Sequence, residues 1–106
     1  MVSLSERLKA KAALRTKEVR IDGEAFVVRE VGAVEFGEYG KAAKTDQVKA
    51  TALLLASCVL DEEGNASLTS ADAAEIAKSA RVTMPLVQAI MEVSGFGADE
   101  KESDAS

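Results

Sequence analysis

The chain has 106 residues, of which 47% are apolar and 29% are charged, and its formal net charge at pH 7 is −5. This length allows one domain, and the composition is typical of a globular protein rather than of a disordered or membrane-spanning chain. The acidic balance disfavours nucleic acid as a partner, and the absence of histidine removes the commonest general base and metal ligand.

The apolar residues of the chain are unusually small. Alanine supplies 19 of them, and its burial contributes much less than the burial of leucine or phenylalanine. We therefore expect a thin core and modest stability. Self-association or a partner would add to that stability, and a marginally stable monomer is the alternative.

Three features bear on the cellular compartment. The single cysteine, Cys58, excludes an internal disulfide. No stretch approaches the roughly 20 apolar residues of a membrane span, and the N-terminal residues lack the uninterrupted apolar segment of a secretory signal. We expect a cytosolic protein that does not contact a membrane.

Residues 1–20 carry six basic and two acidic side chains and begin with a helix signal. Ser3 and Glu6 form a capping box, and Leu4 and Leu8 recur at helical spacing, which predicts a helix over residues 4–14. A basic helix could contact phosphate or lipid, but a solvated helix face is the commoner explanation of this pattern.

The clearest pattern in the chain is a β-hairpin. The dipeptide Asp22-Gly23 suits a two-residue turn, because both residues tolerate positive φ. Counting outward from the turn pairs Ile21 with Glu24 and Val19 with Phe26. One face of the hairpin is apolar and must be covered by helices, because a lone hairpin is barely stable in water. Its members are Val19, Ile21, Phe26 and Val28.

Two helices are expected after the hairpin. The first covers residues 33–43, and the second begins after Thr45, which is a suitable cap. A change from helix to strand near Cys58–Leu60 is an alternative end for the second helix. Its apolar stripe is Val48, Ala52, Leu55 and Val59.

Residues 59–77 look at first like a calcium-binding loop but lack its spacing. Counted from Asp61, the sixth position should be glycine and the twelfth glutamate, whereas these positions hold Ala66 and Asp72. We interpret the stretch as a polar turn with Gly64 in the left-handed conformation, followed by a helix that Thr69 caps. No metal site is expected.

The C-terminal part predicts two more helices and a tail. One helix covers residues 70–80, and the next is capped by Thr83, has Pro85 in its first turn and ends at Gly95. The acidic residues 98–106 are expected to be disordered.

The fold class is therefore α+β. We expect one small, mostly helical domain over residues 1–97, with four to five helices and one N-terminal antiparallel β-hairpin over residues 17–31.

The sequence offers no catalytic chemistry. Without histidine there is no Ser-His or Cys-His pair, and no phosphate-binding loop is present. We expect an interaction protein with no cofactor, and not an enzyme. Two apolar helix stripes are the candidate contact surfaces, although such stripes more often belong to a core. Their residues are Leu53, Leu54, Leu55, Leu86, Ile90, Met91 and Phe96.

The order of these elements resembles a known family. The chain has first a charged hairpin, then a helix with a polar start and then an aliphatic segment that ends in VLDEEGNASLTSAD. These elements are followed by a helix pair, Gly-Phe-Gly and an acidic tail. This order, across residues 17–100, resembles the tail assembly chaperones of long-tailed bacteriophages, the family of the lambda G protein. Leu68 stands where an aromatic residue is common. The matching residues are Val59, Leu60, Asp61, Glu63, Gly64, Leu68, Thr69, Asp72 and Gly95-Phe96-Gly97.

The resemblance implies a non-virion protein of the host cytoplasm that binds the tape measure protein, keeps it soluble and helps to recruit tail tube subunits. Many such proteins also have a longer frameshifted product, which here would join after Gly97. The alternative that the residues leave open is a small regulatory protein that contacts nucleic acid through its basic N-terminal helix.

Overall fold

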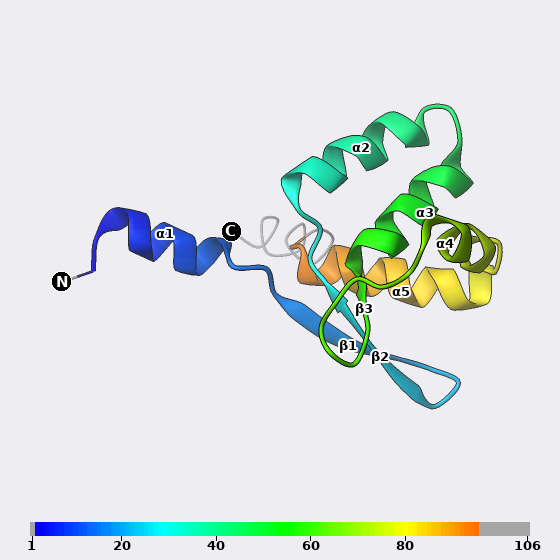
Figure 1. Cartoon of the computed structure of the whole chain (residues 1–106), viewed down its shortest axis with the longest axis horizontal. Coiled ribbons are helices and arrows are strands. Elements are labelled where there is room, and N and C mark those ends of the chain that lie inside the picture. The colour runs from blue at the N-terminus through cyan, green and yellow to red at the C-terminus, as the bar shows by residue number, and fades with distance from the viewer. Residues whose placement is uncertain (1, 96–106) are drawn as a thin grey trace, which may run out of the picture.

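A computed structural model describes residues 2–95 of the chain (Figure 1). Five helices and one antiparallel sheet confirm the expected α+β class with its N-terminal hairpin. The expected acidic tail lies outside the described residues, and the division of the chain at residue 97 stays a prediction. The elements in chain order are α1 (Leu4–Ala12), β1 (Thr16–Ile21), β2 (Glu24–Arg29), α2 (Ala33–Ala43), α3 (Gln47–Cys58), β3 (Val59–Leu60), α4 (Ser70–Ala77) and α5 (Ala80–Val93).

The β-hairpin forms with the predicted register. The turn Asp22-Gly23 has φ angles of 53° and 84°, and glycine adopts such values without steric cost. Ile21 faces Glu24, and Val19 faces Phe26. Local turn chemistry therefore sets which side chains share a face of the hairpin.

Strand β3 lies on the other side of β2. Val27 faces Leu60 and Val28 faces Val59, which gives the strand order β1-β2-β3. Helix α3 ends at Cys58 and the chain passes directly into this strand, which confirms the alternative end considered for that helix.

Helix α5 covers the apolar face of the hairpin, as the alternation of side chains predicted (Figure 1). Val28 is fully buried, and Val19, Ile21 and Phe26 pack against the core. This packing supplies the cover that an isolated hairpin would lack.

Ion pairs join α5 to the hairpin at both ends. Lys17 Nζ lies 2.7 Å from Glu92 Oε1, and Arg81 Nη1 lies 2.6 Å from Asp22 Oδ2. Both pairs are exposed, so each contributes little to stability. They orient the helix, with its N-terminus at the hairpin turn and its C-terminus beside the start of β1.

Helix α3 lies at the centre of the core. Leu54, Leu55 and Cys58 are almost completely buried and belong to one cluster with Ala73 of α4 and Ile90 of α5. Four of the ten buried apolar residues in the described part are alanines, so close helix packing buries little area. This is the thin core that the composition predicted.

The start of α3 differs from the prediction. The cap is Asp46, whose carboxylate accepts the N–H of Lys49 at 3.1 Å. Thr45 instead donates its hydroxyl to the carbonyl of Ala42 at 3.3 Å and so belongs to the end of α2. Threonine and aspartate can both cap a helix. Here Thr45 is used by the turn that ends α2, so Asp46 is the residue left to cap α3.

The start of α5 also differs. The predicted cap Thr83 and the predicted first-turn residue Pro85 both lie inside α5, because this helix begins at Ala80. Helix α4 ends at Ala77 instead of residue 80, and a tight turn closes it, in which the N–H of Ser79 donates to the carbonyl of Ile76 at 3.0 Å. Thr83 is 7% exposed, and its hydroxyl is a second donor to the same Ile76 carbonyl, at 2.9 Å.

Leu55→Ala should lower the free energy of unfolding by about 2–5 kcal/mol, because it leaves a cavity at the fully buried centre of the core. Urea denaturation followed by circular dichroism measures this change. The matched control is Val34→Ala, at a side chain that is 71% exposed, and its effect should stay within about 0.5 kcal/mol. Similar effects of the two substitutions would contradict a core centred on α3.

Thr83→Val should destabilise the chain by about 1 kcal/mol, because it keeps the shape of the side chain but buries an apolar group where one of the two hydrogen bonds to the Ile76 carbonyl was made. Thr45→Val removes a comparable but exposed hydrogen bond and should have little effect. Thermal unfolding of both variants provides the comparison. A Thr83→Val variant as stable as the parent would show that water or another donor replaces the hydroxyl.

Candidate interaction surfaces

The residues predicted to contact a partner lie in different environments. Leu53 and Met91 are half-buried, and Phe96 lies outside the described residues. The remaining four are buried in the core, namely Leu54, Leu55, Leu86 and Ile90. In this conformation, therefore, only Leu53 and Met91 of the described candidates offer surface to another protein.

Leu53 lines an apolar hollow between α3 and α4, which we call the α3–α4 groove. The groove has a volume of about 350 Å³. Its apolar lining is Val48, Ala52, Leu53, Ala56 and Ala74, and its polar lining is Asp46, Lys49 and Ser70. A groove of this size and chemistry can accept apolar side chains from a partner.

The geometry of α3 places its small side chains beside the groove. At about 100° per residue, the buried residues Leu54 and Cys58 lie on one side of the helix, and Ala52 and Ala56 lie toward the other. Val48 was predicted to continue the apolar stripe of α3, but it is 48% exposed at the rim of the groove.

Leu53 lies between two hollows. On the α2 side it contributes, with Lys49, to a second hollow of about 460 Å³ that also includes Glu38, Lys41 and Ala42. The second hollow is more polar, because Glu38, Lys41 and Lys49 line it. Leu53 is therefore an apolar side chain that a partner can approach from either α2 or α4.

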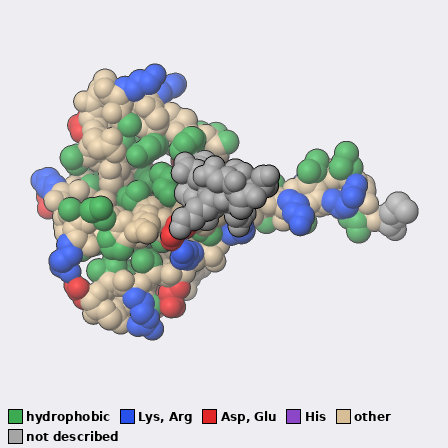
Figure 2. Space-filling model, turned by 180° about the vertical axis from the view of Figure 1, so that it is seen from behind, with side chains coloured by type: hydrophobic (Ala, Val, Ile, Leu, Met, Phe, Trp, Pro, Cys, Tyr) green, Lys and Arg blue, Asp and Glu red, His purple; other side chains and the backbone are tan. Residues whose placement is uncertain are grey.

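Other exposed apolar side chains were not proposed as contacts. Val34 is 71% exposed, and Met84 is 67% exposed. Phe36 is 42% exposed, and its ring stacks on Tyr39 with 6.3 Å between the ring centroids. Figure 2 shows hydrophobic side chains in several patches on one face of the body. No continuous helical stripe in the sequence pointed to these residues.

Helix α1 stands apart from the body of the molecule (Figure 1). Its residues are all exposed. Ser3 Oγ accepts the N–H of Glu6 at 3.1 Å, which confirms the predicted cap. The basic side chains of α1 remain open to solvent, as the alternative of a nucleic-acid contact would require.

Two candidate kinds of reactive group can be located in the described residues. Cys58 is fully buried, and this burial raises the pKa of its thiol to about 11, so it is not a nucleophile at neutral pH. Among residues 2–95 no group of three or more Cys, Asp or Glu side chains could hold a metal ion.

The turn that resembles a calcium loop is held by its own backbone. The N–H groups of Asn65 and Glu63 each donate to the Asp61 carboxylate at 2.9 Å, and the hydrogen bond from Asn65 is the largest cause of the lowered pKa of Asp61. Gly64 has a φ of 84°, as predicted for a left-handed turn residue.

No helix within residues 2–95 combines the length and the apolar character needed to cross a lipid bilayer.

Comparisons with known proteins give a structural match. No protein-family model matches the chain, and no curated protein matches it by sequence. The fold is similar to that of the bacteriophage HK97 tail assembly chaperone, with a TM-score of 0.64 and 17% sequence identity. The match covers 85% of this chain and 95% of that one. The resemblance drawn from the order of sequence elements thus extends to the three-dimensional fold.

The stability of the chain should fall between pH 9 and pH 11 because of Cys58. The unfolded thiol ionises near its ordinary pKa of 9.0, whereas the folded thiol keeps its proton up to about 11. Rising pH therefore favours the unfolded state, by about 2–3 kcal/mol over this range. The difference in unfolding free energy between the parent and Cys58→Ala should shrink by this amount as pH rises. A constant difference would contradict the raised pKa.

Proposed function

We propose that this chain is a tail assembly chaperone of a long-tailed bacteriophage, acting in the host cytoplasm. The observation that carries the proposal is the fold, which matches nearly the full length of the HK97 tail assembly chaperone. The absence of histidine and the buried state of Cys58 favour an interaction protein over an enzyme.

The partner in this proposal is the tape measure protein, and the chain would also help to recruit tail tube subunits. A long helix-forming chain exposes apolar stripes before assembly, and such stripes cause aggregation when left uncovered. The α3–α4 groove supplies apolar lining for side chains of such a stripe. Leu53 and Val48 would form the centre of this contact, and the buried leucines would hold its shape.

A second candidate function is favoured by the exposed bases of α1. A small regulatory protein could bind nucleic acid through this helix, and such binding would weaken steeply with salt. The charge of residues 21–97 argues against nucleic-acid binding, because these residues carry six basic and twelve acidic side chains and would repel phosphate. Absence of DNA or RNA binding at low salt would remove this candidate.

Co-expression of the chain with the tape measure protein of the same phage should raise the soluble fraction of that protein, and the two should co-purify. Leu53→Asp should abolish both effects, because it places a charge at the centre of the groove. Val34→Asp is the matched control, since it makes the same kind of change at an exposed helical residue outside the groove. Soluble fractions are measured by sedimentation of lysates.

Two results would contradict the proposal. One is a tape measure protein whose solubility does not respond to the parent chain. The other is an equal loss of solubilisation in Leu53→Asp and Val34→Asp, which would show that solubilisation does not depend on the groove. Unchanged thermal unfolding of both variants is needed for this comparison.

A further inference from the structure

Helix α1 carries apolar side chains that the body of the molecule does not cover. Leu4 is 64% exposed and Leu8 is 58% exposed, and the flanking residues Val2 and Leu14 are 57% and 50% exposed. The helix has nine residues, and an isolated helix of this length is marginal in water. The arm formed by residues 2–14 therefore has both apolar area and helical order to gain from a partner.

The charges of this arm are placed at the edges of its apolar stripe. At about 100° per residue, Leu4, Leu8 and Ala12 fall within an arc of about 80°. Lys11 and Arg7 lie along one edge of that arc, and Lys9 lies beyond the other. Arg7 and Lys11 are thus next to the leucines on one side, and on the other side the first charged residue is Lys9, beyond Ala12.

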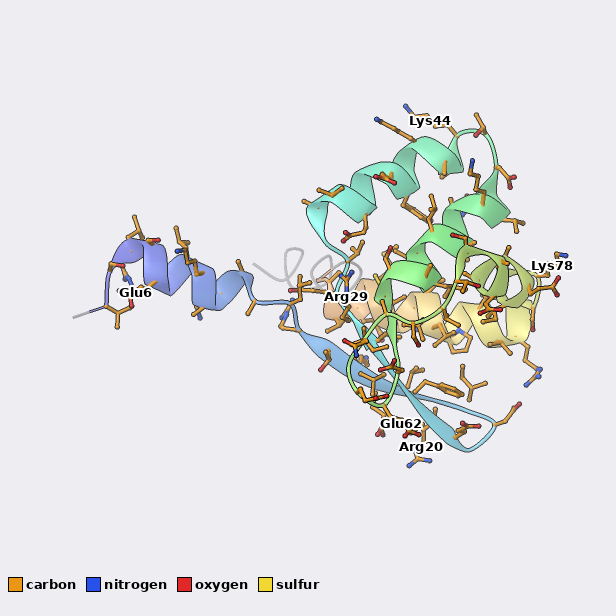
Figure 3. The ribbon with its side chains drawn as sticks, viewed as in Figure 1. Glu6, Arg20, Arg29, Lys44, Glu62 and Lys78 are labelled. Carbon is orange, nitrogen blue, oxygen red and sulfur yellow. The ribbon has the colours of Figure 1, made fainter. Side chains whose placement is uncertain are left out.

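The acidic side chain of the arm does not neutralise these bases. At about 100° per residue Glu6 lies on the side of the helix opposite Leu4 and Leu8, and its carboxylate accepts the Ser3 hydroxyl at 3.1 Å. Figure 3 shows Glu6 on α1, away from the body of the molecule. Within residues 2–95 no carboxylate forms an ion pair with Arg7, Lys9 or Lys11. Figure 2 shows the basic and hydrophobic side chains of the arm together, away from the body.

The root of the arm is attached firmly to the sheet. The N–H of Glu30 donates to the carbonyl of Arg15 at 2.8 Å, and the N–H of Arg15 donates to Glu30 Oε1 at 3.2 Å. Only Ala13 and Leu14 separate this attachment from the end of α1. The arm is therefore presented outward from a defined point of the body.

We propose that α1 docks on an acidic amphipathic helix of another protein, with Leu4 and Leu8 against the apolar stripe of that helix and the flanking bases against its carboxylates. The inference rests on the proposed function only where it identifies the partner as a tail component. The chemistry expected of the partner helix is argued from the arm alone. An apolar stripe whose nearest charged residues are all basic matches a helix whose apolar stripe is flanked by carboxylates.

Other binding partners fit the arm less well. An anionic membrane would be repelled by the acidic body, and residues 1–20 contain no aromatic side chain to insert at a lipid interface. Nucleic acid would bind the basic side chains of the arm through its phosphates but would leave the leucines exposed.

The test uses the full chain and a labelled synthetic peptide of three heptads, with leucine at both core positions and glutamate at both flanking positions of each heptad. Fluorescence anisotropy should report saturable binding that weakens with salt. The double variant Leu4→Ser/Leu8→Ser and the triple variant Arg7→Glu/Lys9→Glu/Lys11→Glu should each weaken binding by about tenfold or more. Ala10→Gln, on the opposite side of α1, is the matched control and should bind as the parent does.

Three outcomes would overturn the inference. The first is equal binding by the parent and the leucine variant, and the second is equal binding of a peptide with lysine at the flanking positions. The third is absence of peptide binding together with leucine-dependent binding to phosphatidylglycerol vesicles, to duplex DNA or to a second copy of the chain. Unchanged thermal unfolding of every variant is expected, because α1 lies outside the core.

The inference and the proposed function can fail separately. If the leucine variant solubilises the tape measure protein as well as the parent does, and no peptide binds, the arm inference fails and the proposed function stands. If the peptide binds as described but the parent does not solubilise the tape measure protein, the proposed function fails and the chemistry of the arm stands.

Discussion

The rest of the structure depends on the burial of α3. This helix packs against α2, α4 and α5, and the strand that follows it pairs directly with the hairpin. Its Leu54 and Leu55 are among the largest fully buried side chains in the described part. The surrounding alanines let the helices approach closely, but they add little apolar area, so a few large side chains carry much of the stability.

Because most leucines of α3 and α5 are buried in the core, little apolar surface of these helices remains exposed to other proteins. The leucines that fill the interior cannot contact another protein while the chain stays folded, so the proposed contacts are limited to residues at the edges of the helices. Leu53 and Val48 lie at one such edge, in the α3–α4 groove. The exposed leucines of α1 form a separate surface with a different charge environment.

The fold was readable from the sequence where local chemistry decides the structure. Asp22-Gly23 determined the hairpin register, and Thr69 determined the start of α4, because each acts within a few residues. Thr45 and Thr83 were misassigned as caps, because their roles depend on where the preceding helix ends. Whether a helix continues for another turn is a tertiary question that propensity alone does not answer.

The candidate site was less readable. The triplet Leu53-Leu54-Leu55 covers about 200° of a helix, so its pattern does not say which residue faces out. That choice is made by the packing of α2, α4 and α5 around α3, which the local sequence of the triplet does not contain. Leu4 and Leu8 were recognised as a helical repeat, but their exposure depends on the chain entering β1 without folding back on the body.

The outward position of the arm has a consequence for length selectivity. The described part of the chain extends over 48 × 34 × 28 Å, with the arm along its longest direction (Figure 1). A helix must have roughly 30 residues to span such a length at 1.5 Å per residue. A ligand long enough to touch both arm and groove would gain avidity from two individually weak contacts, whereas a short helix would engage one and dissociate quickly. The distance between the arm and the far side of the body therefore sets the shortest helix that can reach both surfaces.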